Sequence, residues 1–227
     1  MNTITIRPFA TLKRVTLAAL ALLLLLLNSC EWVGERGNGR ITTETRQISG
    51  FTRLVADGAF TVTWTPGPAA LKITTDQNLL QYIRTNNSGD QLRIDWSKPL
   101  KGTHGIKVAI SSPALERVEL NGASRMTALN LAGAEFYLEA NGASRVTLSG
   151  NVNAMAGEMN GASRLDAADL KTRAMELSIS GAGKAEVNVS EALKVEISGA
   201  GKVTYTGSPT VSKSISGAGS VRRRGED

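Results

Sequence analysis

Cysteine and histidine are nearly absent from this 227-residue chain, which contains one residue of each. A single cysteine, Cys30, cannot form an intramolecular disulfide, so the fold must be stable without a covalent crosslink. A single histidine, His104, excludes a histidine cluster that could hold zinc, and we expect it to be a loop residue. Gly-x-Ser-x-Gly, Walker-loop and His-Glu-x-x-His motifs are missing, so neither a cofactor nor a metal ion is expected.

Aromatic residues are also scarce, at 4% of the chain, so the core must come mainly from Val, Ile, Leu and Ala. Positive charge is only mildly in excess, with a formal net charge of +6. Three of the basic residues (Arg7, Lys13 and Arg14) precede a signal-like segment, and without them the net charge is +3. A balance this mild does not indicate binding to nucleic acid.

The apolar run Val15 to Leu27 has thirteen residues. This length is typical of a signal-peptide core and is shorter than the roughly 20 residues of a membrane-spanning helix. The sequence Leu27-Asn-Ser-Cys30 follows directly and resembles the lipobox of bacterial lipoproteins. We therefore predict a lipoprotein signal peptide over residues 1–29 and a lipid anchor on Cys30, with simple secretion as the alternative. Glu31 favours the outer membrane over the inner membrane.

Residues 30–45 are rich in glycine and charge, which predicts a flexible tether. From residue 46 onward, short runs alternate between apolar and polar residues, and this period predicts strands with one buried face. Only residues 77–84 predict a helical turn or two. The predicted strands of the first half lie at Phe51–Val55, Phe60–Trp64, Leu71–Thr74, Gln91–Trp96 and Ile106–Ile110.

Six copies of a five-residue corner motif recur at intervals of 18 to 20 residues, a period typical of a solenoid. The predicted fold class is all-β: a parallel β-helix or β-solenoid of about 18–20 residues per coil with a less regular, strand-rich N-terminal half. Asp57-Gly-Ala-Phe60 resembles an early corner, so we expect the N-terminal half to form longer coils and to cap the solenoid. The six copies begin at Asn121, Asn141, Asn160, Ser180, Ser198 and Ser216.

The corner motif has a structural interpretation at most of its positions. Its second residue is glycine, which permits a sharp turn with positive φ. The alanine that follows is expected to point inward, where a larger residue would not fit. The leading asparagines are expected to form a ladder of hydrogen-bonded amides along the solenoid, and the serines of the later copies to continue it.

The last position of the motif predicts a basic stripe, because equivalent residues of successive coils lie one strand spacing apart. Glutamates occur two residues before several corners, at Glu119, Glu139, Glu158 and Glu196. One hypothesis is that the two series neutralise each other in weak surface pairs. The other is that the stripe binds a phosphate- or carboxylate-bearing glycan. The candidate anion-binding residues are Arg125, Arg145, Arg164, Lys184 and Lys202.

Asp166 and Asp169 are the best-placed acidic pair, and their position between predicted strands favours a turn-forming role over a calcium site. A polysaccharide-cleaving enzyme would need several carboxylates and a base on one face, and the sequence does not reveal such a cluster. We therefore predict that the protein is not an enzyme.

The strand-rich first half and the six corners together resemble the bacterial family named putative auto-transporter adhesin, head GIN domain. The resemblance rests on Ile48–Val55, Gly58–Val62, Gln91–Ile94 and the corners, and it defines a domain over residues 46–222. It implies a β-helix-like fold in cell-envelope proteins and supplies no catalytic or binding residues.

These observations predict a non-enzymatic, lipid-anchored envelope protein that presents a solenoid surface for binding or adhesion. Its expected partners are the membrane, through the anchor, and an acidic glycan or an envelope protein. Its expected location is the outer membrane, where it faces either the surroundings or the periplasm. The alternatives are a periplasm-facing scaffold that binds another envelope protein and, more remotely, an enzyme that acts on polysaccharide.

Overall fold

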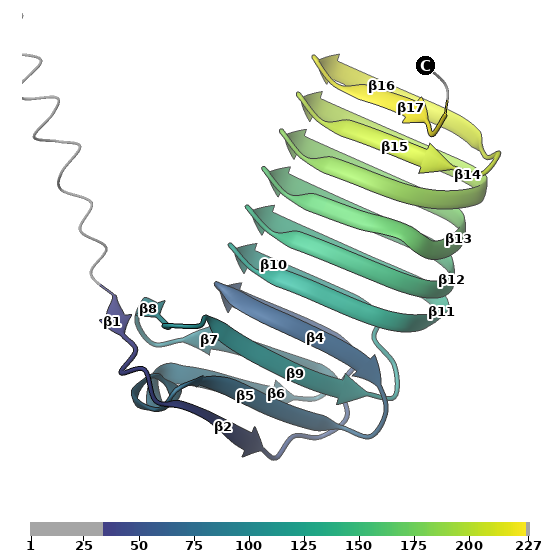
Figure 1. The fold of residues 1–227 in the computed structure, drawn as a ribbon. Helices are drawn as coiled ribbons and strands as arrows, with labels where there is room; N and C mark the ends of the chain where they lie inside the picture. The colour runs from purple at the N-terminus through teal and green to yellow at the C-terminus, as the bar shows by residue number, and fades with distance from the viewer. Residues whose placement is uncertain (1–33, 226–227) are drawn as a thin grey trace, which may run out of the picture. The chain divides into compact units, whose positions relative to one another are not determined.

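A computed structural model describes residues 34–225, and β-strands dominate this part of the chain (Figure 1). The predicted signal peptide and Cys30 lie outside the described residues. Strand formation follows from the sequence period, because buried and exposed side chains alternate along strands such as β4 (Phe60–Pro66) and β9 (Ile106–Ser112). The all-β prediction is confirmed.

The C-terminal part of the chain forms a β-solenoid of about five coils, as predicted. The solenoid has two stacks of parallel-paired strand segments, which we call its ladders. Each of four long strands runs in one ladder, bends, and continues in the opposite ladder, as the curved ribbons show (Figure 1). Neighbouring coils pair in parallel. The strands of this part are β10 (Arg117–Gly122), β11 (Arg125–Gly142), β12 (Arg145–Gly161), β13 (Arg164–Gly181), β14 (Lys184–Gly199), β15 (Lys202–Thr206), β16 (Thr210–Gly217) and β17 (Ser220–Arg223).

Equivalent residues of successive coils stay in register despite the varying repeat length. Asn121 pairs with Asn141, and Asn141 pairs with Asn160. The differences in length are absorbed by register shifts inside the long strands, for example between Ala128 and Leu131 of β11. Residues 190–192 therefore lie within β14, whereas residues 207–209 separate β15 from β16.

The first coil of the solenoid is formed by β3 (Arg53–Gly58) and β4, as the early corner at Asp57 predicted. Asp57 pairs with Asn121 and Gly58 with Gly122, while Thr61 of β4 pairs with Arg125. Beyond this coil, β7 (Gln91–Trp96) pairs in parallel with β3, and β9 pairs in parallel with β4.

The remaining N-terminal strands do not continue the solenoid, so the expectation of longer coils is wrong for them. β6 (Ile83–Ser88) forms an antiparallel hairpin with β7, because the Gly89-Asp90 turn is too short for a crossover. β5 (Ala70–Asp76) is antiparallel to both β9 and β2 (Ile41–Arg46). These strands cover the end of both ladders (Figure 1).

The predicted helical turn is present as η1 (Gln77–Tyr82), a 3-10 helix whose Leu79 and Leu80 are buried. The predicted tether is not free along its length, because β1 (Glu35–Arg36) pairs with β8 (Leu100–Lys101) and β2 pairs with β5. The backbone groups of these strands find partners in the domain, so β1 and β2 belong to it.

A buried carboxylate joins this N-terminal segment to the rest of the fold. Asp76 is fully buried, and it accepts hydrogen bonds from the backbone N of Gly39 (2.7 Å), the backbone N of Thr103 (2.8 Å) and Thr103 Oγ1 (2.8 Å). Burial tends to raise the pKa of Asp76, but the bonds from Thr103 and Gly39 outweigh it and hold the pKa below its usual value.

Candidate functional site

The corner glycines adopt the positive φ that the sequence predicted, for example +90° at Gly142. A Cβ at this position would lie 2.5 Å from the carbonyl oxygen of Gly122 in the preceding coil. The same carbonyl accepts a hydrogen bond of 2.9 Å from the backbone N of Ala143. The corner therefore needs glycine both for its backbone conformation and for the close approach of neighbouring coils.

The corner alanines do not point inward, and this prediction is wrong. Ala123, Ala143 and Ala162 are exposed, whereas the following residues Ser124 and Ser144 are buried. The period of two continues through the glycine turn, because Leu120, Ser124 and Met126 are all buried, so the serine side chain and not the alanine enters the coil. Ser124 Oγ donates there to the carbonyl oxygen of Gly58 at 3.0 Å.

The asparagine ladder is confirmed. Asn160 Nδ2 donates to Asn141 Oδ1 and Asn141 Nδ2 donates to Asn121 Oδ1, each at 2.8 Å. Asn121 Nδ2 in turn donates to Asp57 Oδ1 at 2.6 Å, which ties the ladder to the first coil. Ser180, Ser198 and Ser216 keep the register, but within residues 34–225 their side chains form no hydrogen bonds, so the ladder of side-chain bonds ends at Asn160.

The five predicted stripe cations occupy one column of paired residues on the ladder that follows the corner. We call this set the basic column: Arg125, Arg145, Arg164, Lys184 and Lys202. All five are exposed. Lys107 of β9 extends the column beyond Thr61, which pairs with Arg125. Sequence reasoning missed Lys107 because no corner motif precedes it.

The glutamates do not neutralise the basic column, so that hypothesis is wrong. They lie on the ladder before the corner, on the opposite sheet of the coil, and have other partners. Glu139 Oε1 accepts from Asn141 Nδ2 at 3.0 Å, and Glu196 pairs with Lys194 at 3.2 Å. Within residues 34–225, the five cations of the basic column form no ion pair and no side-chain hydrogen bond.

The exposed alanines leave room beside the arginines of the column. A shallow hollow of about 170 Å³ runs along the first three regular corners. Larger residues at the alanine positions would fill it, so small size at this position keeps the guanidinium groups accessible from the side. The hollow is lined by Ala123, Ala143, Ala162, Arg125, Arg145 and Arg164.

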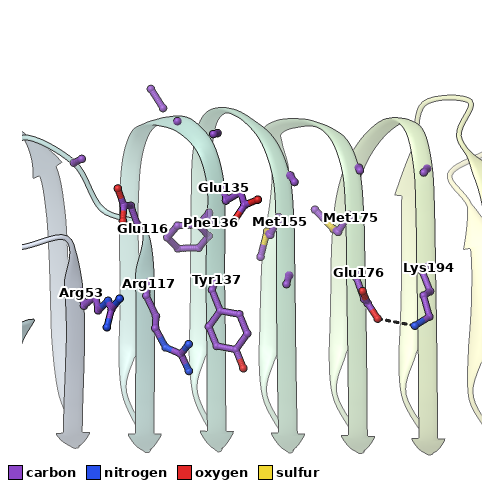
Figure 2. A pocket seen from close by; sticks show the side chains of 18 residues that line it. Arg53, Glu116, Arg117, Glu135, Phe136, Tyr137, Met155, Met175, Glu176 and Lys194 are labelled. Atoms are coloured by element: carbon purple, nitrogen blue, oxygen red, sulfur yellow. Dashed lines mark hydrogen bonds and ion pairs between the residues drawn. The ribbon is translucent and has the colours of Figure 1, made fainter.

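A larger groove of about 900 Å³ lies on the other ladder, near the bend of the long strands (Figure 2). Tyr137 stands in it, and the guanidinium carbon of Arg117 lies 4.0 Å from the centre of its ring. Burial and a hydrogen bond to Glu158 raise the pKa of Tyr137 to about 12. Sequence reasoning missed this groove, although the Ala-Met pairs at 154–155 and 174–175 are a repeated signal for it.

The other sequence candidates lie apart from both hollows. His104 is exposed in a loop, where its Nδ1 lies 3.1 Å from Thr103 Oγ1. Asp166 and Asp169 are exposed on β13, and Asp166 Oδ1 accepts a long bond of 3.5 Å from the backbone N of Ala168. Residues 34–225 contain no group of three or more His, Cys, Asp or Glu side chains that could hold a metal ion. No helix among these residues is long and apolar enough to cross a membrane.

Stacked parallel coils behind an N-terminal cap define a β-solenoid protein, here with a column of exposed cations on one face. The chain belongs to the family described as putative auto-transporter adhesin, head GIN domain, whose sequence pattern matches residues 50–209. No protein of curated function matches the chain.

Solved structures support the fold. A putative adhesin from Bacteroides fragilis is 21% identical with a TM-score of 0.65, covering 84% of this chain and 100% of its own. A putative adhesin from Parabacteroides merdae is 20% identical, with a TM-score of 0.55 and coverage of 83% and 98%. A protein from Parabacteroides distasonis described as a putative lipid binding protein is 22% identical, with a TM-score of 0.52 and the same coverage.

Proposed function

We propose that this protein is a non-enzymatic, lipid-anchored protein of the bacterial cell envelope that binds an anionic glycan through its basic column. Membership of a family described as adhesins supports a binding role, and the solved relatives are described as adhesins or as a binding protein. The lipobox-like sequence before Cys30 supports the anchor and an outer-membrane location.

The observation that carries the proposal is the unpaired state of the five column cations. Charges aligned one strand spacing (about 4.8 Å) apart repel each other, so an aligned and unneutralised column lowers stability slightly. A polyanion that lies along the solenoid axis removes this repulsion and meets several cations at once. Multivalent contact of this kind gives useful affinity from individually weak surface pairs.

The direct test measures binding of polygalacturonate, a linear carboxylate-bearing glycan, to the protein and to a variant with all five column residues replaced by serine. We expect binding at least about tenfold weaker in the variant. The matched control replaces five exposed cations elsewhere by serine, with the same change in net charge: Arg40, Lys72, Lys101, Lys171 and Lys213. Equal weakening in both variants would show a general charge effect and would overturn the column as a site.

Two further measurements test the anchor and the orientation. Palmitate labelling should occur in the wild type and disappear in Cys30→Ser. Protease treatment of intact cells should cleave a protein that faces the surroundings. A protein that is protected until the outer membrane is opened would instead favour the alternative of a periplasm-facing scaffold.

A further inference from the structure

The groove near the bend of the long strands has features of a second binding site, separate from the basic column. It lies on the ladder before the corner, whereas the basic column lies on the ladder after it. Its volume of about 900 Å³ falls within the range of protein ligand sites. Figure 2 shows that its side chains come from successive coils, so the groove runs along the solenoid axis.

The wall of the groove is mainly apolar and is made of small side chains. Ala154, Ala174 and Ala192 pair in one column across β12, β13 and β14. Met155 and Met175 pair in the adjacent column and also line the groove, with exposed fractions of 2% and 3%. Alanines leave space above the strands, whereas the Met155 and Met175 side chains are buried in the core of the coil beneath the groove.

Most charged side chains around the groove are already paired. Lys194 Nζ lies 2.7 Å from Glu176 Oε1, and Arg53 Nε lies 3.2 Å from Asp90 Oδ2. Arg117 pairs with Glu139 at 3.6 Å, in addition to its contact with the Tyr137 ring. Within each pair the positive and negative charges neutralise each other, so none of the cations that line the groove is unpaired.

Two carboxylates are the exception. Glu116 and Glu135 are exposed, and within residues 34–225 neither has a hydrogen bond or an ion pair from its side chain. Figure 2 shows them on either side of Phe136, and Glu135 begins the column that continues with Ala154 and Ala174. The end of the groove that holds the paired Arg53 and Arg117 therefore also carries the two unpaired carboxylates.

We propose that this groove binds an extended apolar segment of a partner protein, with a basic residue of that segment held between Glu116 and Glu135. The distance from β11 to β14 is three strand spacings, or about 14 Å, which an extended peptide covers with about four residues. The charge of the groove is complementary to a Lys or Arg side chain at one end of the segment. An anionic lipid does not fit this arrangement, because its headgroup would meet the two free carboxylates.

The test uses two synthetic peptides, acetyl-Leu-Val-Leu-Ala-Lys-Lys-amide and the same sequence with Glu in place of both Lys residues. The readout is the nuclear magnetic resonance of the methionine methyl groups. All four methionines are buried, but Met155 and Met175 lie directly beneath the groove, whereas Met126 and Met159 do not line it and serve as internal references. We expect the Lys peptide to shift the signals of Met155 and Met175 and to bind about fivefold or more tightly than the Glu peptide.

Variants separate the two parts of the proposal. Glu116→Gln combined with Glu135→Gln should remove the preference for the Lys peptide. Ala174→Arg should block the groove and abolish binding, while Ser178→Arg, on the exposed side of the same strand outside the groove, should leave binding unchanged. Ala192 is exposed, so Ala192→Arg provides a second blocking variant if Ala174→Arg does not fold.

Three outcomes would overturn the proposal: equal binding of the two peptides, no shift of Met155 and Met175 with either peptide, or tighter binding of dodecyl phosphate than of the Lys peptide. Failure here is distinguishable from failure of the glycan proposal. The variant without the basic column should still bind the Lys peptide, and Ala174→Arg should still bind polygalacturonate.

Discussion

The N-terminal region, residues 35–112, and the repeats, residues 117–223, reach the same strand-rich structure with different contacts. In the N-terminal region strands run in both directions, and single contacts hold them together: Trp64 Nε1 donates to Ser112 Oγ at 2.9 Å, and Asp76 joins three donors. In the repeats, one set of contacts recurs in register from coil to coil. A single substitution in the N-terminal region removes a contact that has no copy, whereas a substitution in a repeat removes one contact of a series.

The largest loss of stability is expected from replacing a corner glycine. Such a loss would show that the repeats, too, contain positions at which a single substitution is not tolerated. Gly142→Ala brings a Cβ to 2.5 Å from the Gly122 carbonyl oxygen and imposes positive φ on alanine. We expect the free energy of unfolding to fall by about 4 kcal/mol. The control is Gly105→Ala in the N-terminal region, which also has positive φ but open space around it, with an expected loss of about 1 kcal/mol. Chemical denaturation measures both, and equal losses would contradict the proposed clash.

The next effect concerns the buried carboxylate of the N-terminal region. Asp76→Ala leaves the backbone N–H groups of Gly39 and Thr103 without their acceptor, and we expect a loss of about 3 kcal/mol. Asp166→Ala, which removes an exposed carboxylate from the repeats, should change stability by less than about 0.5 kcal/mol. Similar losses for the two variants would remove the distinction between unique and repeated contacts.

The lowered pKa of Asp76 also predicts the direction of the pH dependence. Its folded pKa lies below the unfolded value of about 3.9, so its contribution is present above that value and is lost as the pH falls through the folded pKa. Between about pH 5 and pH 2, the wild type should therefore lose more stability than Asp76→Ala does. Parallel curves for the two proteins would contradict this account of Asp76.

A smaller effect compares the early and late corners of the repeats. The early corners place serine inside the coil, whereas the late corners have Gly183 there, since a Cβ at 183 would lie 2.9 Å from Ile179 Cγ2. Gly183→Ser should cost about 2 kcal/mol through this overlap. Adding Ile179→Leu, which removes the Cγ2 methyl group, should recover part of the loss. A double-mutant cycle with no coupling would show that the two positions vary independently.

The smallest effect concerns the ladder. Asn141→Ala removes bonds to Asn121 and Glu139 and one from Asn160, and we expect a loss of about 1 kcal/mol because the groups left behind can reach water. Ser198→Ala, at the equivalent position of a later coil, should cost less than about 0.5 kcal/mol. Thermal unfolding of the two variants measures the difference, and a larger loss at Ser198 would mean that the serines do continue the ladder.

The repeats could be predicted from the sequence because the same corner motif occurs six times at a nearly constant interval. The period gave the coil length, and the register then aligned the asparagines and the cations without further information. The inward serine was missed because the corner was treated as a break between strands, whereas the buried positions Leu120, Ser124 and Met126 keep one period of two through it.

The N-terminal region was predicted less well, for a related reason. The alternation of apolar and polar residues located its strands. The antiparallel direction of β5 and β6, however, depends on the turns and on which neighbouring strands are still unpaired, and no sequence repeat indicates either. The prediction of a tether over residues 30–45 misses β2 because glycine and charge dominate the segment before this strand. The groove was missed because its shape depends on the bend that brings Ala154 and Ala174 beside Tyr137, and the sequence contains no motif for this bend.

The most direct test of the central claim measures how the affinity for polygalacturonate depends on salt concentration. If the basic column holds the polymer, the slope of log affinity against log salt should become shallower with each column residue replaced by serine, by roughly 0.7 per cation if polygalacturonate behaves as single-stranded nucleic acid does. Arg145→Ser, Arg145→Ser with Arg164→Ser, and the variant with all five replacements form the series. Stepwise loss of slope is the predicted result. An unchanged slope across the series would contradict the assignment of anion binding to the basic column.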